Sequence, residues 1–293
     1  MIAVVGGRGF IGGAIVKALR GAGHEVVVVT HTRDAAGARG HRFGDMLRPE
    51  TLGPALSGAE VVVQAAMFPT YPIEKPGRGQ TFEEFDGRGT ERLVTAARAA
   101  GVRRYIYISG SGIPAESPRP YFQAILRGEK AVTGSGMEAV CVRPAFVYGP
   151  LDHGLNRILS AAKKLPFLPV VGTGRQLEQP VFVEDLAEVV RQAVGSGAPT
   201  GVFEVGGPER FTLDEMLSRF FRVVGLSRPV VHVPYGLARF GAALLELLPG
   251  PPLTVNAVDF LTEDFVADTR ALLSSFDVRL TPFEEGLRKY LPR

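Results

Sequence analysis

The chain has 293 residues, of which 45% are hydrophobic, and a formal net charge of +3. This length suits one large or two moderate domains with a buried core, and the scattered basic residues argue against nucleic acid as the principal partner. No apolar run reaches the roughly eighteen residues of a transmembrane helix. Cys141 stands alone and Ile2 already begins a core strand, so we expect a cytoplasmic protein without a secretion signal. The histidines lack metal-ligand spacing, and we expect no metal site.

The first thirty residues have the order of a βαβ unit. An apolar strand over residues 2–5 is followed by a glycine turn, a helical pattern over 13–22 and a second apolar strand over 26–29. Glycines in such a turn allow a tight bend and bring the backbone close to a pyrophosphate, which then lies at the helix N-terminus. The pattern therefore predicts a dinucleotide site in the turn, formed by Gly6, Gly7, Arg8, Gly9, Phe10, Ile11 and Gly12.

The end of the second strand indicates which dinucleotide binds. NAD-specific sites carry a carboxylate about 20 residues after the glycines, where it accepts a hydrogen bond from the ribose 2′-hydroxyl. Here Thr30 and Arg33 occupy this region, and the first carboxylate is Asp34. A 2′-phosphate calls for a guanidinium and hydroxyl donors, which Arg33 and Thr30 can supply, with Arg8 as a second cation. We therefore favour NADP(H) over NAD(H). The alternative for Arg33 is a solvated loop charge.

Apolar strand patterns then alternate with helical patterns. The strands are expected near residues 42–43 and over 61–65, 105–109, 139–147 and 202–205, with a helix over 90–100. This alternation implies a parallel sheet with helices on both faces and a ligand crevice beyond the carboxyl ends of the strands. The residues at those ends are Ala65, Ala66, Met67, Ser109, Gly110, Ser111 and Pro144.

Residues beyond 150 predict a smaller second domain. It contains a helix over 155–165, strands over 170–172 and 179–183, and a helix over 212–224 that Thr212 and Glu215 begin with a capping box. Residues from about 178 to 206 return to the first domain, so 1–150 bind the dinucleotide and 151–177 with 207–293 provide the substrate or partner side. The helical pattern from Tyr235 to Leu248 is apolar around most of its circumference. It packs against its own domain or forms a surface for a protein partner or a membrane.

As a set, these motifs resemble the extended, atypical branch of the short-chain dehydrogenase/reductase superfamily over nearly the whole chain. The motifs that carry the resemblance are Gly9-Phe10-Ile11-Gly12, Gly44-Asp45, Gly89-Thr90, Tyr105-Ile106-Tyr107-Ile108-Ser109, Arg143-Pro144, Tyr148-Gly149-Pro150, Val183-Glu184-Asp185 and Gly206-Gly207-Pro208. The resemblance implies a Rossmann-type, doubly wound α/β domain with a smaller mixed α/β C-terminal domain. It also implies that Asp45 meets the adenine, that Ala65 and Ala66 meet the ribose and phosphates, and that Pro144 flanks the nicotinamide.

The same resemblance implies a catalytic Ser, Tyr and Lys, and here the sequence departs from the family pattern. Tyr121 matches the tyrosine, but Ile125 stands one helical turn later, where the lysine belongs. A lysine would hold the nicotinamide ribose and lower the pKa of the tyrosine, and isoleucine can do neither. Gly110 occupies the serine position, between Ser109 and Ser111.

Two functions from different classes follow. The first is an NADPH-dependent oxidoreductase acting on a small-molecule carbonyl substrate, with Tyr121 as proton donor and Ser109 or Ser111 orienting the oxygen. The second is a non-catalytic protein that holds NADP(H) as a sensor or as part of an assembly. The second resembles the group that contains the nucleotide-binding accessory subunit of respiratory complex I. An epimerase or dehydratase comes third, because these enzymes also rely on the missing lysine.

Overall fold

A computed structural model describes residues 1–33, 37–68, 73–114, 116–248, 251 and 253–291. Its centre is a seven-stranded parallel sheet with the strand order β11-β6-β5-β4-β1-β2-β3. The strands are β1 (Ile2–Val5), β2 (Val26–Thr30), β3 (His41–Phe43), β4 (Val61–Gln64), β5 (Arg104–Ile108), β6 (Glu138–Pro144) and β11 (Gly201–Val205). The doubly wound α/β fold predicted from the sequence is confirmed.

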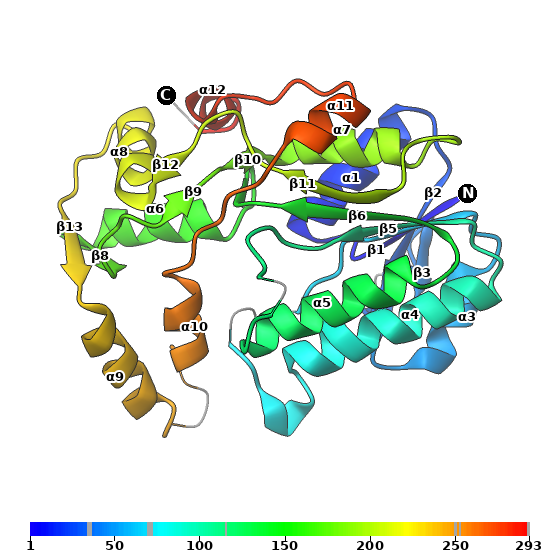
Figure 1. Ribbon diagram of the computed structural model, residues 1–293, viewed down its shortest axis with the longest axis horizontal. Coiled ribbons are helices and arrows are strands. Elements are labelled where there is room, and N and C mark those ends of the chain that lie inside the picture. The colour runs from blue at the N-terminus through cyan, green and yellow to red at the C-terminus, as the bar shows by residue number, and fades with distance from the viewer. Residues whose placement is uncertain (34–36, 69–72, 115, 249–250, 252, 292–293) are drawn as a thin grey trace.

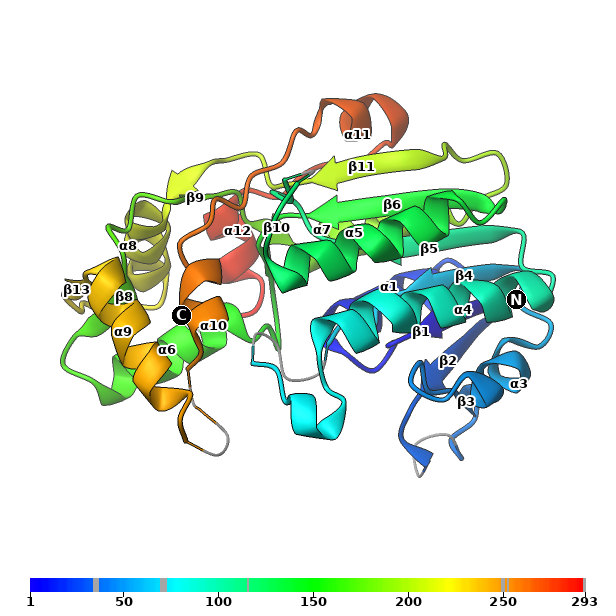
Figure 2. The same ribbon diagram turned by 60° about the horizontal axis from the view of Figure 1, so that its bottom comes forward.

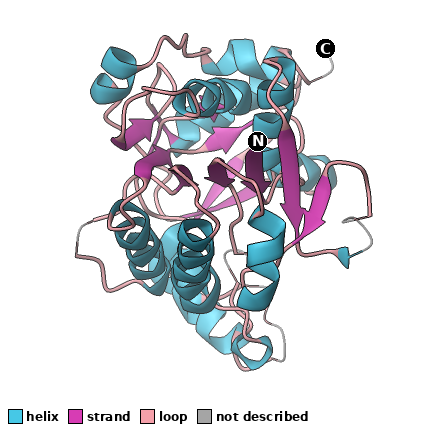
Figure 3. Ribbon diagram, turned by 90° about the vertical axis from the view of Figure 1, so that its right-hand side faces the viewer, coloured by secondary structure: helices cyan, strands magenta, loops and turns pink. Residues whose placement is uncertain are grey.

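Helices cover both faces of the sheet (Figures 1 and 3). On one face lie α1 (Phe10–Gly21), α7 (Val183–Ala193) and α11 (Arg270–Ser275), and on the other α3 (Leu52–Leu56), α4 (Arg88–Ala99) and α5 (Pro120–Thr133). Successive side chains of a strand point to opposite faces, so Val4 and Val28 enter one core while Ala3 and Val5 enter the other. Because both faces are buried, the strands are continuously apolar.

A second lobe follows the sheet (Figure 2). Its elements are α6 (Gly154–Lys164), β8 (Leu168–Val171), β9 (Leu177–Glu178), β12 (Phe211–Thr212), α8 (Leu213–Val223), β13 (Val230–Val233), α9 (Tyr235–Leu245), α10 (Val255–Phe260) and α12 (Phe283–Arg288). Its core is rich in aromatic side chains, including Tyr148, Phe182 and Phe220. The predicted capping box at the start of α8 is confirmed by the reciprocal hydrogen bonds of Thr212 and Glu215.

Several element boundaries differ from the sequence prediction. Helix α1 begins at Phe10 rather than at residue 13, because Gly9 is extended and already acts as the N-cap. The strand predicted over 139–147 divides into β6 and the short β7 (Val147–Tyr148), which pairs with β10 (Val181–Phe182). The strand predicted over 179–183 is confirmed only over β10, because α7 begins at Val183. Glu184 and Asp185 explain that start, since acidic side chains in the first turn stabilise a helix N-terminus.

The remaining local features are the burial of the single cysteine, the start of α4, two short 3-10 turns and the length of the helices. Cys141 is free and buried, and burial raises the pKa of its thiol to about 12. Helix α4 begins at Arg88, directly after a π-helical turn over Glu83–Gly87, where the sequence predicted a start at residue 90. Short 3-10 turns occur at Pro49–Thr51 and Pro76–Arg78. Within the described ranges, no helix is both long and apolar enough to cross a bilayer.

Candidate functional site

The glycine turn between β1 and α1 is held against two neighbouring strands. The Gly6 N–H donates to Val29 O at 3.3 Å, and the Ala65 N–H donates to Val5 O at 2.9 Å. Gly6 has a φ of +81°, and a Cβ there would stand 2.6 Å from the Ala66 nitrogen. A Cβ on Gly12 would stand 2.2 Å from Gly6 O. Only glycine fits these two positions, so the close approach inferred from the motif is present in the structure.

The first turn of α1 keeps its backbone donors available for a ligand. Gly9 is the N-cap and provides no side-chain hydrogen bond, and the first turn has no acidic residue. The N–H groups of Phe10, Ile11 and Gly12 therefore lie at the positive end of the helix dipole without a capping side chain. Gly7 packs against Val16 and Val28, which brings helix and strand together. This arrangement fits a diphosphate.

The residues predicted to select the nucleotide lie at the ends of β2 and β3. Arg33 is exposed, and its guanidinium lies over the Phe43 ring at 4.7 Å from the centroid. Thr30 is buried and its Oγ1 accepts the Thr32 N–H. Asp45 accepts the Leu47 N–H at 2.9 Å. Arg8 is exposed in the glycine turn. Asp34 lies outside the described residues.

The ends of the next three strands lie along the same edge of the sheet. Ala65, Ala66 and Met67 follow β4, and Met67 is exposed. The loop after β5 is fixed to the end of β6, because the Ser111 N–H donates to Pro144 O at 2.9 Å. Since the sheet is parallel, the predicted residues of six strand ends are brought to one edge.

The two candidate serines have different surroundings. Ser109 Oγ donates to Glu129 Oε1 at 2.6 Å, and Arg143 Nε donates to the same oxygen at 2.7 Å. The Ser109 hydroxyl is therefore already hydrogen-bonded to the ion pair of Glu129 and Arg143. Ser111 is only 2% exposed, and its hydroxyl has no hydrogen-bond partner among the described residues. Buried polar groups are normally paired, so the Ser111 hydroxyl is the one that remains available for a ligand.

Tyr121 lies at the start of α5, next to the serine loop. Its hydroxyl is 3.6 Å from the position that a Cβ on Gly110 would occupy. Ile125 follows one turn later and is 4% exposed. Tyr121 and Ile125 lie one turn apart on the continuous helix α5, so they share one face of it as predicted. Arg127, two residues after Ile125, does not take the place of the lysine, because it is paired with Glu91 on the surface.

Aromatic side chains surround the Tyr121 ring. Phe82 and Phe260 meet it edge-on, with centroids 5.2 Å and 5.6 Å away. Phe260 in turn contacts Phe265 at 4.7 Å. A small cavity of about 20 Å³ is lined by Phe82, Tyr121 and Phe260 together with Arg119 and other residues of α5 and α10. Helix α10 therefore places an apolar wall beside the tyrosine.

Asp86 is an unusual buried acid in the same region. It lies in the π-helical turn before α4, is 3% exposed, and accepts the Phe68 N–H at 3.2 Å, while its second oxygen has no partner among the described residues. Burial, with a smaller contribution from Glu74, raises its pKa from 3.8 to about 7. Its carboxyl group is therefore partly protonated at neutral pH.

Sequence reasoning did not identify Asp86, Glu129 or Phe260. Glu129 is eight residues after Tyr121, and the available signal was a carboxylate on the otherwise apolar buried face of this helix. Asp86 and Phe260 offered no comparable signal, because their burial depends on segments distant in the sequence.

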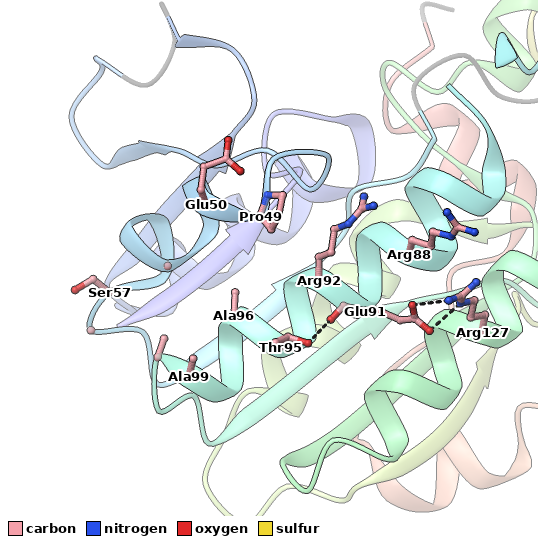
Figure 4. A pocket seen from close by; sticks show the side chains of 13 residues that line it. Pro49, Glu50, Ser57, Arg88, Glu91, Arg92, Thr95, Ala96, Ala99 and Arg127 are labelled. Atoms are coloured by element: carbon pink, nitrogen blue, oxygen red, sulfur yellow. Dashed lines mark hydrogen bonds and ion pairs between the residues drawn. The ribbon is translucent and has the colours of Figure 1, made fainter. Parts of the chain in front are cut away.

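A second cavity, of about 810 Å³, lies away from this edge of the sheet (Figure 4). It runs between α4 and the segment around α3, with Arg88, Arg92 and Arg127 at one end. None of the predicted site residues lines it. In the described part of the chain, no group of three or more His, Cys, Asp or Glu side chains could hold a metal ion.

Comparison with known proteins adds an independent finding. Residues 2–206 match the model of the NAD dependent epimerase/dehydratase family. The chain is 28% identical to an Arabidopsis thaliana mitochondrial protein, NADH dehydrogenase [ubiquinone] 1 alpha subcomplex subunit 9, over 92% of this chain and 71% of that protein. It is also 28% identical to the decarboxylating sterol-4-alpha-carboxylate 3-dehydrogenase of Mus musculus, over 84% and 74%.

The fold is shared with solved structures of low sequence identity. One of them is UDP-glucuronic acid 4-epimerase from Bacillus cereus in complex with UDP-glucuronic acid and NAD. It aligns with a TM-score of 0.75 at 19% identity, covering 98% of this chain and 96% of the epimerase.

Proposed function

Because the chain belongs to the NAD dependent epimerase/dehydratase family, we propose that it binds NADP(H) at the glycine turn and reduces the carbonyl group of an apolar substrate. Tyr121 is the proton donor in this proposal, and Ser111 orients the carbonyl oxygen. The observation that carries it is the buried hydroxyl of Ser111, which has no partner among the described residues and lies one residue from the glycine that the Tyr121 hydroxyl approaches.

The cofactor would lie along the carboxyl ends of the strands. The N–H groups of Phe10, Ile11 and Gly12 would hold the diphosphate, because no side chain caps them. Asp45 would meet the adenine, Ala65, Ala66 and Met67 the ribose and phosphates, and Pro144 would flank the nicotinamide. In this reading residues 1–150 with about 178–206 bind the dinucleotide, and 151–177 with 207–293 form the substrate side.

The extra phosphate of NADP(H) would meet Arg8, Thr30 and Arg33. The Arg33 guanidinium is exposed and forms no ion pair with a described residue. It can therefore bind a phosphate without breaking an existing ion pair. Its stacking on Phe43 orients it at little entropic cost. The Thr30 hydroxyl accepts one hydrogen bond and keeps its proton for donation.

The two polar side chains would divide the chemistry between them. A bound nicotinamide would supply the hydride. The Tyr121 hydroxyl would donate a proton to the carbonyl oxygen, and the Ser111 hydroxyl would donate a hydrogen bond that holds this oxygen in place. Ser109 is a positioning residue, since its hydroxyl is committed to Glu129. The aromatic wall of Phe82 and Phe260 favours an apolar substrate, as does the similarity to a sterol dehydrogenase.

Hydride transfer from labelled NADPH to a panel of apolar aldehydes and ketones tests the proposal. We expect measurable reduction, and a loss of about 10²-fold to 10⁴-fold in Tyr121→Phe. Ser111→Ala should lose more activity than Ser109→Ala, which serves as the matched control. Equal losses in the two serine variants would remove Ser111 from the mechanism, and full activity in Tyr121→Phe would remove the tyrosine.

A non-catalytic accessory role is the second candidate, and two observations favour it. Ile125 leaves the tyrosine without a lysine on its helix face. Helix α9 exposes large apolar side chains, among them Leu237, Phe240 and Leu244, and of its residues only Ala242 is buried. The similarity to a complex I subunit is consistent with a protein partner at this helix. Tight NADPH binding without any hydride transfer would favour this role.

A further inference from the structure

Glu178 is a buried acid on the second lobe that the proposed mechanism does not use. It lies on β9 between two neighbours: Phe211 of β12 pairs with it on one side, and Phe265 bridges to it on the other. The segment around Phe265 joins α10 to α11 and runs beside β9 (Figure 2). Leu177 fixes this segment, because its N–H donates to Asp264 Oδ1 at 2.7 Å.

The same segment lies against the loop that carries Ser111. Gly112 has a φ of +68°, and a Cβ there would stand 2.6 Å from Asp264 O. On the other side, Gln179 Nε2 donates to Gly207 O at 2.8 Å, just beyond the carboxyl end of β11. Glu178 and Asp264 are therefore attached to the edge of the sheet where the candidate catalytic residues gather.

The electrostatics of this position disfavour anions. Glu178 is 7% exposed, and its Oε2 has no partner among the described residues. Burial, reinforced by repulsion from Asp264, raises the pKa of the Glu178 carboxyl to about 8. No described lysine or arginine forms an ion pair with Glu178 or Asp264, and Arg119, on the Tyr121 side, is already paired with Glu263.

We propose that Glu178 is a specificity-determining residue that selects an uncharged, apolar carbonyl compound and excludes nucleoside diphosphate substrates. The inference rests on the proposed function and names the substrate class of that site. The protonated carboxyl of Glu178 donates a hydrogen bond to a neutral acceptor on the substrate, and Phe260 and Phe265 surround the apolar part.

A nucleoside diphosphate would meet acidic side chains at this position, where it needs cationic groups or hydrogen-bond donors. Diphosphates are bound by arginine forks, lysines or free backbone donors. Bringing one beside Glu178 and Asp264 would place its two phosphate charges next to acidic side chains, with no described lysine or arginine paired there to compensate them. An epimerase of the same fold was solved with UDP-glucuronic acid, so the fold itself accepts such a ligand, and selection against it here is assigned to side chains such as Glu178.

The test uses the 293-residue chain saturated with NADP⁺, which cannot reduce the ketone, after calorimetry has measured NADPH binding on its own. Binding of 2-undecanone and of UDP-glucuronic acid is then measured by ligand-observed NMR titration. We expect wild type to bind the ketone and not the nucleotide sugar. Glu178→Gln keeps a neutral donor and should bind the ketone within about twofold, whereas Glu178→Leu should bind it about tenfold more weakly. Glu178→Arg should gain measurable UDP-glucuronic acid binding.

The exposed acid Glu184, on α7, provides the matched control, and Glu184→Arg should behave as wild type. UDP-glucuronic acid binding to the wild type, no ketone binding, or an unchanged ketone affinity in Glu178→Leu would each overturn the inference. Absent NADPH binding would instead contradict the proposed function. Calorimetry with NADPH on the same variants separates failure of the inference from failure of the proposed function, because substitution of Glu178 is expected to leave the NADPH affinity unchanged.

Discussion

The two ends of the candidate site differ in how completely they are built. At the glycine turn, the φ of +81° at Gly6 and the uncapped first turn of α1 both fit a dinucleotide. At the start of α5, Tyr121 lies beside the serine loop, but Ile125 replaces the expected cation. In this chain the residues proposed to bind the cofactor are separate from those proposed to act on the substrate, so the fold can keep one set while the other departs from the family pattern.

The Tyr121 end of the candidate site also contains buried polar groups. The Ser111 hydroxyl and one Asp86 oxygen are buried without a partner among the described residues, while Glu129 is compensated by Arg143. Unpaired buried groups cost stability, so they are retained where they serve a ligand. Substitutions at both ends of the candidate site test this contrast.

The largest effect is expected at the cofactor end. Gly12→Ala would place a methyl group 2.2 Å from Gly6 O, so we expect NADPH affinity to fall by about 100-fold or more. Calorimetry measures this. Gly13→Ala is the matched control, because its Cβ would lie at an ordinary 3.8 Å from Gly7 O. Unchanged affinity in Gly12→Ala would show that the turn does not hold the cofactor.

The next prediction concerns the missing cation at the catalytic end. Ile125→Lys should raise the hydride-transfer rate at pH 7 by about 10²-fold, because an ammonium group on the Tyr121 face stabilises the ionised phenol. Ile125→Met controls for the change in packing. If the lysine variant is folded and binds NADPH but gains no activity, the missing lysine is not what limits the hydride-transfer rate.

The selection of NADP(H) depends on an exposed guanidinium. Arg33→Ala should weaken NADPH binding about tenfold and leave NADH binding unchanged, because only the 2′-phosphate meets this side chain. Arg39→Ala, in the same connection between β2 and β3, should change neither affinity. Equal loss for both nucleotides in Arg33→Ala would contradict the assignment of NADP(H).

The smallest effect concerns stability and pH. The pKa of Asp86 is 3.8 when exposed and about 7 in the fold, so its stabilising protonation is complete below about pH 4 and is lost as the pH rises through 7. Asp86→Asn cannot ionise, and we expect it to be more stable than wild type by about 1–3 kcal/mol at pH 8. At pH 4.5 the two should differ much less. Urea unfolding at both pH values measures this, with Glu50→Gln as an exposed control.

The fold could be predicted from the sequence because its signals are local. The valine-rich strands β1, β2 and β4, the glycines between them, and the capping box of α8 each depend on neighbouring residues. The strand predicted over 179–183 is shorter in the structure for the opposite reason, because its length depends on a pairing partner distant in the sequence. Its valines suit a strand, but pairing with β7 ends at Phe182 and the acids after Val183 begin a helix.

The candidate site could be predicted only in part. The glycines, Tyr121 and Ile125 are visible as spacings along the chain. Glu129, Asp86 and Glu178 are not, because their importance comes from burial by segments far away in the sequence. For Glu178 the burying segment lies about ninety residues later, at Phe265, which no periodicity in the sequence reveals.

Calorimetric titration of the wild-type protein with NADPH and with NADH tests the central claim most directly. If the glycine turn and its arginines form a dinucleotide site, NADPH gives saturable heat with one site per chain and binds more tightly than NADH. No heat from either nucleotide at millimolar concentration would contradict the account.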